Sequence, residues 1–310
     1  DQINTPDGPL HDLLVAEQLH CNLNDQPTLR VGRVPTAVNP TTLVKEIGSV
    51  GDTMFAASEY QKDGLVAIVE VAGKDNPLFD RRQRGADDLW ANASVSTPYG
   101  PVPTSGTEAD GEQLQVLSRL FTMTGDPKYL DWAERIADKY LLPGGFVPTK
   151  LRDHGSEIIG GLGLLYAVES VHRPAKAEIY RPHIEYMLDE VLANGTNAAG
   201  LMYNNLGGGG LSDSWGYNYV AYLCYDMIVS PPRYTLGLQQ TLRNLAKPAY
   251  TDYPWEGSSI DGYADSIEGA LYQINRLQVP EAIAWADQET AEHVALRNQN
   301  PDVNTTSLWG

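Results

Sequence analysis

The sequence predicts an all-α protein built from helical hairpins, and three observations support this fold class. Apolar residues recur at helical spacing across residues 107–296. Four clusters of acidic, amide and aromatic residues, over 107–112, 152–157, 212–219 and 261–268, each stand directly before a long apolar run. Roughly 45 to 55 residues, the length of a helical hairpin repeat, separate the clusters. Helices that are apolar on all sides alternate with helices that have one polar face, as two layers of helices would require.

A single domain is expected over residues 1–310, with an irregular first part over 1–106. In this part the pattern predicts a helix over residues 10–23, a loop over residues 25–40 and a second helix over residues 41–60. The β-branched run 65–71 is short, so either a strand or a buried helical turn is expected there. Residues 75–103 are rich in Arg, Asp, Asn, Ser and Pro, which is typical of a long surface loop.

Regular hairpins are expected over residues 107–296. The apolar spacing predicts helices over residues 112–124, 129–141, 156–172, 175–192, 215–228, 234–245, 264–274 and 280–296. A Gly-Asp-Pro turn at 125–127 separates the first two, because Gly often ends a helix and Pro often begins one. The helices over 156–172 and 215–228 are nearly all apolar and are expected to be buried. Roughly ten or eleven helices can be counted in the whole chain, fewer than a ring of six helix pairs needs. Either residues 1–106 supply the remaining helices, or the ring stays open.

The bulk composition excludes several classes of protein. The chain has 310 residues, of which 42% are hydrophobic, so a sizeable core is expected. No apolar run reaches the roughly 18 residues that a membrane span needs. The net charge of −18 disfavours nucleic acid and anionic membranes as partners, because both require a basic surface. An anionic sugar stays open, since Lys150, Arg152 and His154 form a local basic group.

No metal or cofactor is expected. The two cysteines, Cys21 and Cys224, lack the spacing of a zinc site or of a redox motif. Cys224 lies in an apolar helix and is expected to be a buried thiol, and its pairing with Cys21 is left open. The sequence holds no EF-hand, phosphate-loop or nucleophile-elbow motif. The chain begins at Asp1 without a Met, as a processed protein would, and a secreted or periplasmic protein is expected.

The polar clusters supply candidate catalytic carboxylates. Hydrolysis of a glycosidic bond requires two carboxyl groups, one protonated and one ionised. The candidates are Asp153, Glu157, Asp213, Asp265 and Glu268. We expect Asp153 and Asp213 to form the pair. Glu157 and Asp265 are the substitutes, and His154 is expected to polarise the substrate. The alternative interpretation is that these carboxylates only cap helices, because acidic side chains favour helix N-termini.

Aromatic and polar neighbours of the carboxylates are expected to bind a sugar. Sugar rings stack on aromatic faces while their hydroxyls bond to nearby polar groups. The expected substrate-binding residues are Arg152, Trp215, Tyr217, Asn218, Tyr219, Trp255 and Tyr263. Trp90 is a further candidate platform, whereas Trp132 and Trp285 are interpreted as packing residues. The glycine-rich segment 204–210 is expected to be a flexible loop at the rim of a pocket.

The turn between the first two regular helices carries a family resemblance. Residues 124–130 read Thr-Gly-Asp-Pro-Lys-Tyr-Leu, which resembles the turn that joins an inner to an outer helix in (α/α) toroid carbohydrate enzymes. The polar openings and apolar helices at 153–170 and 265–271 are similar to further inner helices of these enzymes. The resemblance covers residues 107–296 and implies an (α/α) toroid. The group includes unsaturated glucuronyl hydrolases, other glycoside hydrolases, polysaccharide lyases and sugar epimerases, so the fold leaves the reaction open.

Three functions are carried forward. A glycan-degrading hydrolase is expected first, because carboxylates outnumber basic groups in the clusters. The alternative is a polysaccharide lyase. In a lyase His154 or Tyr217 would be the base or the acid. Arg152 and Asn218 would hold the carboxylate of a uronate. The third is a non-catalytic helical protein that binds carbohydrate or serves at a surface. The oligomeric state is not predicted.

Overall fold

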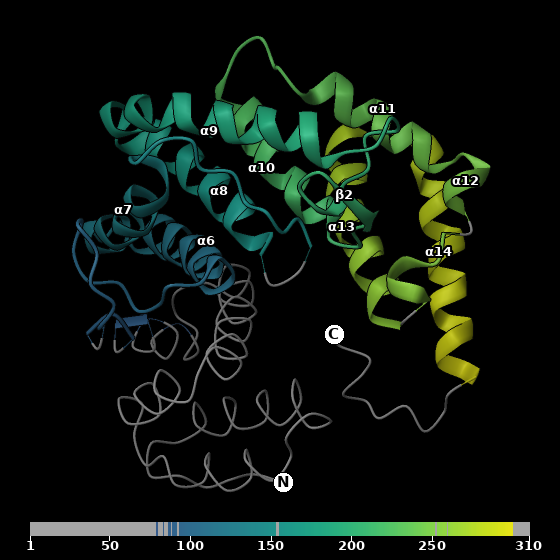
Figure 1. Cartoon of the computed structure of the whole chain (residues 1–310), viewed down its shortest axis with the longest axis horizontal. Coiled ribbons are helices and arrows are strands. Elements are labelled where there is room, and N and C mark those ends of the chain that lie inside the picture. Colours follow the sequence, from purple (N-terminus) through teal and green to yellow (C-terminus); the bar gives the residue numbers. More distant parts are fainter. Residues whose placement is uncertain are drawn as a thin grey trace, which may run out of the picture. The chain divides into compact units, whose positions relative to one another are not determined.

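The computed structural model describes residues 93–152, 155–251, 253–258 and 260–299, together with residues 79, 83, 86, 87 and 89–91. The predictions for residues 10–23, 25–40, 41–60 and 65–71 lie outside this part of the chain. The chain divides into two compact units, residues 1–140 and 141–310 (Figure 1). The described part is mostly helical, which confirms the all-α prediction, and its one sheet has two strands.

In the first unit two helices form the predicted hairpin. They are α6 (Thr107–Thr124) and α7 (Pro127–Leu141). Gly125 ends α6 in the left-handed conformation, with φ 71°, and its N–H donates a hydrogen bond to the carbonyl of Phe121. This is the usual glycine helix stop. α6 begins before the predicted start at residue 112, because Glu108 and Asp110 occupy its first turn, where acidic side chains are favoured.

The surface loop predicted over residues 75–103 is wrong in its first half. The described positions there are helical, and four of them are buried apolar residues, Phe79, Ala86, Leu89 and Trp90. These residues recur at helical spacing, but the Arg and Asp residues between them hide the pattern. Trp90 stacks on Trp132 of α7, with ring centroids 5.2 Å apart. Residues 93–106 are irregular, as predicted.

The second unit holds the remaining elements. They are α8 (Glu157–His172), α9 (Pro174–Gly195), β1 (Tyr203–Asn205), β2 (Gly208–Leu211), α10 (Trp215–Ile228), α11 (Thr235–Leu245), α12 (Pro248–Thr251), the 3-10 turn η2 (Trp255–Gly257), α13 (Ile260–Leu277) and α14 (Pro280–Gln299). α10 covers the predicted residues. α13 is longer at both ends than the predicted range 264–274, because Tyr263 and Leu277 continue the run of core and intermediate positions.

The apolar helices of the second unit lie next to one another. α8 packs on α10, α10 packs on α13, and the more polar helices α9, α11 and α14 pack against them (Figure 1). α8 and α10 run in parallel, since Gly163 faces Ala221 and, one turn further along both helices, Tyr166 stacks on Tyr225. Parallel neighbours start at the same end, so the polar residues before α8 and before α10 are brought together.

Two glycines let α10 and α13 approach until their backbones touch. A Cβ atom added to Gly216 would lie 2.2 Å from the carbonyl carbon of Gly269 and 2.5 Å from its Cα. Any side chain at either position would therefore separate the helices. The adjacent residues, Tyr217 and Glu268, lie beside this contact and are within hydrogen-bonding distance.

A continuous chain of aromatic rings forms the core of the second unit. In order of contact its members are Trp255, Trp285, Trp215, Tyr219, Tyr222, Tyr234, Tyr225 and Tyr166. Neighbouring centroids lie between 5.0 and 6.4 Å apart, mostly edge to face, which is the favourable geometry for aromatic pairs. The chain joins α8, α10 and α14, so the three helices share one core.

The segment predicted as a flexible rim loop forms a β-hairpin instead. β1 pairs antiparallel with β2, and Lys150 forms a bridge with Asn205 on the other edge of β1. The N–H of Leu151 donates to the carbonyl of Asn204 at 2.9 Å. Gly207, Gly208 and Gly209 all have positive φ, so the glycine run serves the tight turn.

The close approach of α10 and α13 generates a stability prediction. Gly216→Ala should lower the free energy of unfolding by about 2–3 kcal/mol, because the added methyl group meets backbone atoms that cannot move independently. Denaturant unfolding followed by circular dichroism measures this change. The matched control is Gly237→Ala in α11, where nothing lies within 4 Å of the added Cβ. That change should stabilise by about 0.5–1 kcal/mol. Equal effects of the two variants would contradict the prediction.

Candidate functional site

The structure brings the second and third polar clusters together at the start of α8 and α10. The carbonyl of Leu151 accepts hydrogen bonds from Ser212 Oγ at 3.0 Å and from Asn218 Nδ2 at 2.8 Å. The segment before α8 is thus held against the first turn of α10. Asp153 and His154, which stand in this segment, lie outside the described residues.

Asp213 is buried directly before α10. Its Oδ1 accepts hydrogen bonds from the N–H of Ser214 at 2.8 Å and from Ser214 Oγ at 3.3 Å, and only 5% of the residue is exposed. Glu157 opens α8 and is half-buried. At the starts of α6, α8 and α10 the N-cap residue makes no side-chain capping hydrogen bond. The first turns of α6 and α8 nevertheless hold Glu108, Asp110 and Glu157, where acidic side chains are favoured, so the capping interpretation keeps its support at these two helices.

Two residues that were expected to hold a substrate carboxylate are engaged within the protein. Arg152 pairs with Glu256 through Nη2 and Oε1 at 2.9 Å. Asn218 donates its amide to Leu151 and is buried, and its Oδ1 accepts no hydrogen bond within the described part of the chain. Both side chains position the loops around the start of α10.

The expected sugar platforms Trp215, Tyr219 and Trp255 are corrected by the structure, because none has an exposed ring face. Each is less than 3% exposed and belongs to the aromatic chain of the core. Trp215 Nε1 donates to Ser266 Oγ at 3.2 Å, and the Tyr219 hydroxyl donates to the carbonyl of Gly200. These three residues support the site from behind.

The expected sugar-binding roles of Tyr263 and Trp90 are corrected for the same reason. Tyr263 is 5% exposed in the first half of α13, and burial raises the pKa of its phenol above the ordinary value. Trp90 is 6% exposed because its ring lies face to face with the ring of Trp132. Trp132 and Trp285 are packing residues, as predicted.

The accessible polar groups lie where α10 meets α13. The Tyr217 hydroxyl donates to Glu268 Oε2 at 3.0 Å, and Asp265 precedes Glu268 by one turn of α13. Glu268 is exposed, whereas Asp265 is half-buried. Burial raises the pKa of Tyr217 far above its usual range, and the charges of Asp265 and Glu268 raise it further. Tyr217 therefore stays a neutral hydrogen-bond donor at every physiological pH.

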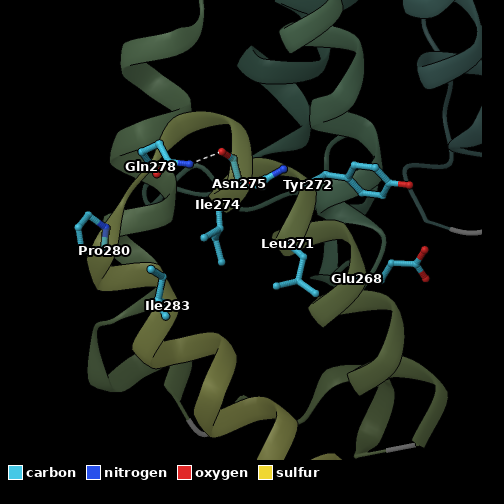
Figure 2. A pocket seen from close by; sticks show the side chains of 8 residues that line it. All are labelled: Glu268, Leu271, Tyr272, Ile274, Asn275, Gln278, Pro280 and Ile283. Atoms are coloured by element: carbon cyan, nitrogen blue, oxygen red, sulfur yellow. Dashed lines mark hydrogen bonds between the residues drawn. The ribbon is translucent and has the colours of Figure 1, made fainter. Parts of the chain in front are cut away.

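A hollow of about 620 Å³ opens beside this contact (Figure 2). Its lining residues are Glu268, Leu271, Tyr272, Ile274, Asn275, Gln278, Pro280 and Ile283. Glu268 thus belongs both to the fourth sequence cluster and to the hollow. Sequence reasoning missed Tyr272, since a tyrosine in the middle of an apolar helix is usually a packing residue. Together, Tyr217, Asp265, Glu268 and the hollow form the candidate site.

The first sequence cluster lies in the other unit and forms a buried network of its own. Asp110 has no exposed surface, and it accepts hydrogen bonds from Thr104 Oγ1 at 2.5 Å, Lys139 Nζ at 2.6 Å and Tyr140 Oη at 2.7 Å. Burial raises the pKa of Asp110 above its ordinary value of 3.8, although Lys139 opposes the shift. This network joins α6 to α7.

No group of three or more His, Cys, Asp or Glu side chains that could hold a metal ion occurs among the residues that the structure describes. No helix in the same part of the chain is long and apolar enough to cross a membrane. Cys224 is a buried thiol in α10, as predicted.

Comparison with protein-family models, with curated proteins and with solved structures finds no match for this chain.

The buried Asp110 network generates a pH prediction. Because its pKa is raised on folding, Asp110 contributes stability that is present below pH 3.8 and is lost as pH rises through the higher folded value. Asp110→Asn removes this titration, so the dependence of the unfolding midpoint on pH should be flatter above about pH 4, where pH rises through the folded pKa of Asp110. Denaturant unfolding of the full chain at several pH values measures it. Asp131→Asn, an exposed position on α7, is the control and should keep the wild-type pH dependence.

Proposed function

We propose that this chain is a glycoside hydrolase that cleaves a polysaccharide or oligosaccharide at the junction of α10 and α13. One observation carries the proposal. Two carboxylates, Asp265 and Glu268, stand one turn apart on α13, and Glu268 both accepts the hydrogen bond of the Tyr217 hydroxyl and lines an open hollow. Paired carboxyl groups next to a cleft are the chemical requirement for glycosidic hydrolysis.

The spacing of the pair suits this reaction. Positions i and i+3 of a helix have Cβ atoms about 5–6 Å apart on the same face. Retaining glycosidases place their two carboxyl groups about 5–5.5 Å apart, and inverting enzymes place them further apart. Asp265 and Glu268 in α13 therefore share one face of the helix, and we propose cleavage with retention of configuration from the roles that their surroundings give the two groups.

The surroundings of the two carboxylates indicate which one is the nucleophile and which one is the acid. Glu268 is exposed to the hollow and accepts the Tyr217 hydrogen bond, which suits an ionised nucleophile that a donor holds in place. Asp265 is half-buried, and in its protonated form it supplies the proton to the leaving oxygen. As a carboxylate, the form whose charge raises the pKa of Tyr217, it then takes a proton from the water that releases the sugar from Glu268. Tyr217 keeps its own proton, since its pKa is raised, and it orients Glu268 throughout the reaction.

The lyase alternative has less support. A tyrosine base would have to lose its proton, but burial and two neighbouring carboxylates raise the pKa of Tyr217. A uronate substrate also requires a positive group, whereas Arg152 is paired with Glu256 and the residues lining the hollow include no Lys, Arg or His.

The wider architecture fits the proposed activity. The two layers of helices in the second unit are the arrangement that an (α/α) toroid would repeat, and we include this ring in the proposal. A secreted or periplasmic location, where glycans are degraded, is part of the same proposal.

Variant kinetics test the site. Asp265→Asn and Glu268→Gln should each lower the cleavage rate about 10²- to 10⁴-fold, because each removes one half of the acid and nucleophile pair. Tyr217→Phe should lower it about tenfold to a hundredfold, because it removes one hydrogen bond to a charged group. A panel of neutral and uronate polysaccharides is screened by reducing ends and by ultraviolet absorbance of unsaturated products.

The control is Asp287→Asn, an exposed carboxylate on α14 that should leave the rate unchanged. Asp213→Asn is measured alongside. Loss of activity in Asp213→Asn alone, with Asp265→Asn and Glu268→Gln fully active, would move the catalytic pair to the starts of α8 and α10. Ultraviolet-absorbing products would show elimination and overturn the hydrolase.

A further inference from the structure

The hollow beside Glu268 has the size and lining of a small-molecule site. Its volume of about 620 Å³ lies within the roughly 300–1,000 Å³ of ligand pockets. Figure 2 shows Leu271 and Ile274 between Glu268 and Tyr272 on one side and Pro280 and Ile283 on the other. Apolar side chains thus occupy the middle of the hollow, where Ile274 is buried and Leu271 and Ile283 are about half exposed, and polar groups stand beside them.

Tyr272 has an exposed aromatic ring, which the buried aromatic residues of the second unit lack. It is 53% exposed and lies on the exposed face of α13, next to Leu271, which is 51% exposed. An exposed phenol ring can bury the C–H face of a sugar ring, and its hydroxyl can bond to a sugar hydroxyl. Tyr272 also follows Glu268 by four residues on α13, so the two share one face of the helix, and both line the hollow.

The polar margin of the hollow matches hydroxyl groups. Asn275 and Gln278 carry amides that both donate and accept, and Glu268 carries two acceptor oxygens. The lining includes no basic residue. Because a uronate carboxylate would meet Glu268 without a compensating positive charge, an uncharged sugar fits this lining better.

The backbone at Gln278 is consistent with a functional position. Gln278 ends α13 with φ 54°, in the left-handed region where Gly or Asn is usual. Its Nε2 donates to the carbonyl of Asn275, which holds the amide at the margin of the hollow (Figure 2). A strained residue at a ligand site is a recognised pattern.

We infer that this hollow is a subsite for a neutral saccharide, with Tyr272 as the stacking platform and Asn275 and Gln278 as hydrogen-bonding partners of the sugar hydroxyls. The inference deepens the proposed function, on which it rests for the link to cleavage, by assigning the substrate to the class of uncharged glycans.

Binding measurements test the subsite without depending on turnover. Calorimetric titration of the full-length Asp265→Asn protein uses neutral hexasaccharides of glucan, xylan and mannan type and, for comparison, a hexagalacturonate. Tyr272→Ala in this background should weaken binding of the preferred neutral hexasaccharide about tenfold or more, and Tyr272→Phe should keep most of it. Tyr186→Ala, which removes a tyrosine that is 45% exposed on α9, is the matched control and should bind normally.

Gln278→Gly supplies a second readout. It should weaken saccharide binding and at the same time raise the denaturant midpoint, because glycine relieves the left-handed backbone. A purely structural role of Gln278 would change the midpoint alone.

Several outcomes would overturn the inference. They are unchanged affinity in Tyr272→Ala, tighter binding of hexagalacturonate than of every neutral hexasaccharide, and no binding of any neutral hexasaccharide at millimolar concentration. A change from dimer to monomer on sedimentation of Tyr272→Ala, with affinity unchanged, would assign the hollow to contact between two copies of the chain. Loss of affinity in Tyr272→Ala would support the subsite even if Asp265→Asn still cleaved glycans, so the two proposals can fail separately.

Discussion

The backbone contact between Gly216 and Gly269 is the constraint on which the candidate site depends. Since neither residue has a side chain, α10 and α13 touch directly, and the next residues along, Tyr217 and Glu268, meet at hydrogen-bonding distance. A wider spacing of the two helices would separate the phenol from the carboxylate. The same contact places Asp265 near Tyr217, so one packing detail assembles all three groups.

Aromatic packing behind this contact gives the site its rigidity. Trp215 occupies the first position of α10, and its ring is enclosed while its Nε1 donates to Ser266 on α13. On the other side, the carbonyl of Leu151 gathers two hydrogen bonds from the residues around Trp215. Buried polar groups need hydrogen-bond partners, because a buried donor or acceptor without a partner lowers the free energy of unfolding by about 1–3 kcal/mol. The polar clusters in the sequence are therefore partly structural, and only the groups that reach the hollow are available for chemistry.

The helical part of the fold follows from the sequence because its signal is strong and local. Apolar spacing and the Gly-Asp-Pro turn define α6 to α11, α13 and α14 to within a few residues at most ends, whereas the short helix α12 was not predicted. Residues 79–91 were missed because sparse apolar positions are hidden among charges, and β1–β2 was missed because a glycine run carries no strand pattern. At the site, Asp265 and Tyr217 were predicted, whereas burial of Trp215 and exposure of Tyr272 depend on neighbours far along the chain. No local pattern distinguishes these two aromatic residues.

The three enclosed indoles of the second unit have an optical consequence. The ring of Trp285 lies between those of Trp255 and Trp215, with centroids 6.4 Å and 6.2 Å away, and each of the three residues is at most 1% exposed. Rings this close share their excited states, so the trio behaves as a single chromophore with a strong near-ultraviolet circular dichroism. That signal exists only while the side chains are fixed, and it vanishes when tertiary packing loosens even if the helices persist. The protein therefore carries its own reporter of ordered packing, directly behind the residues proposed to act on the glycan.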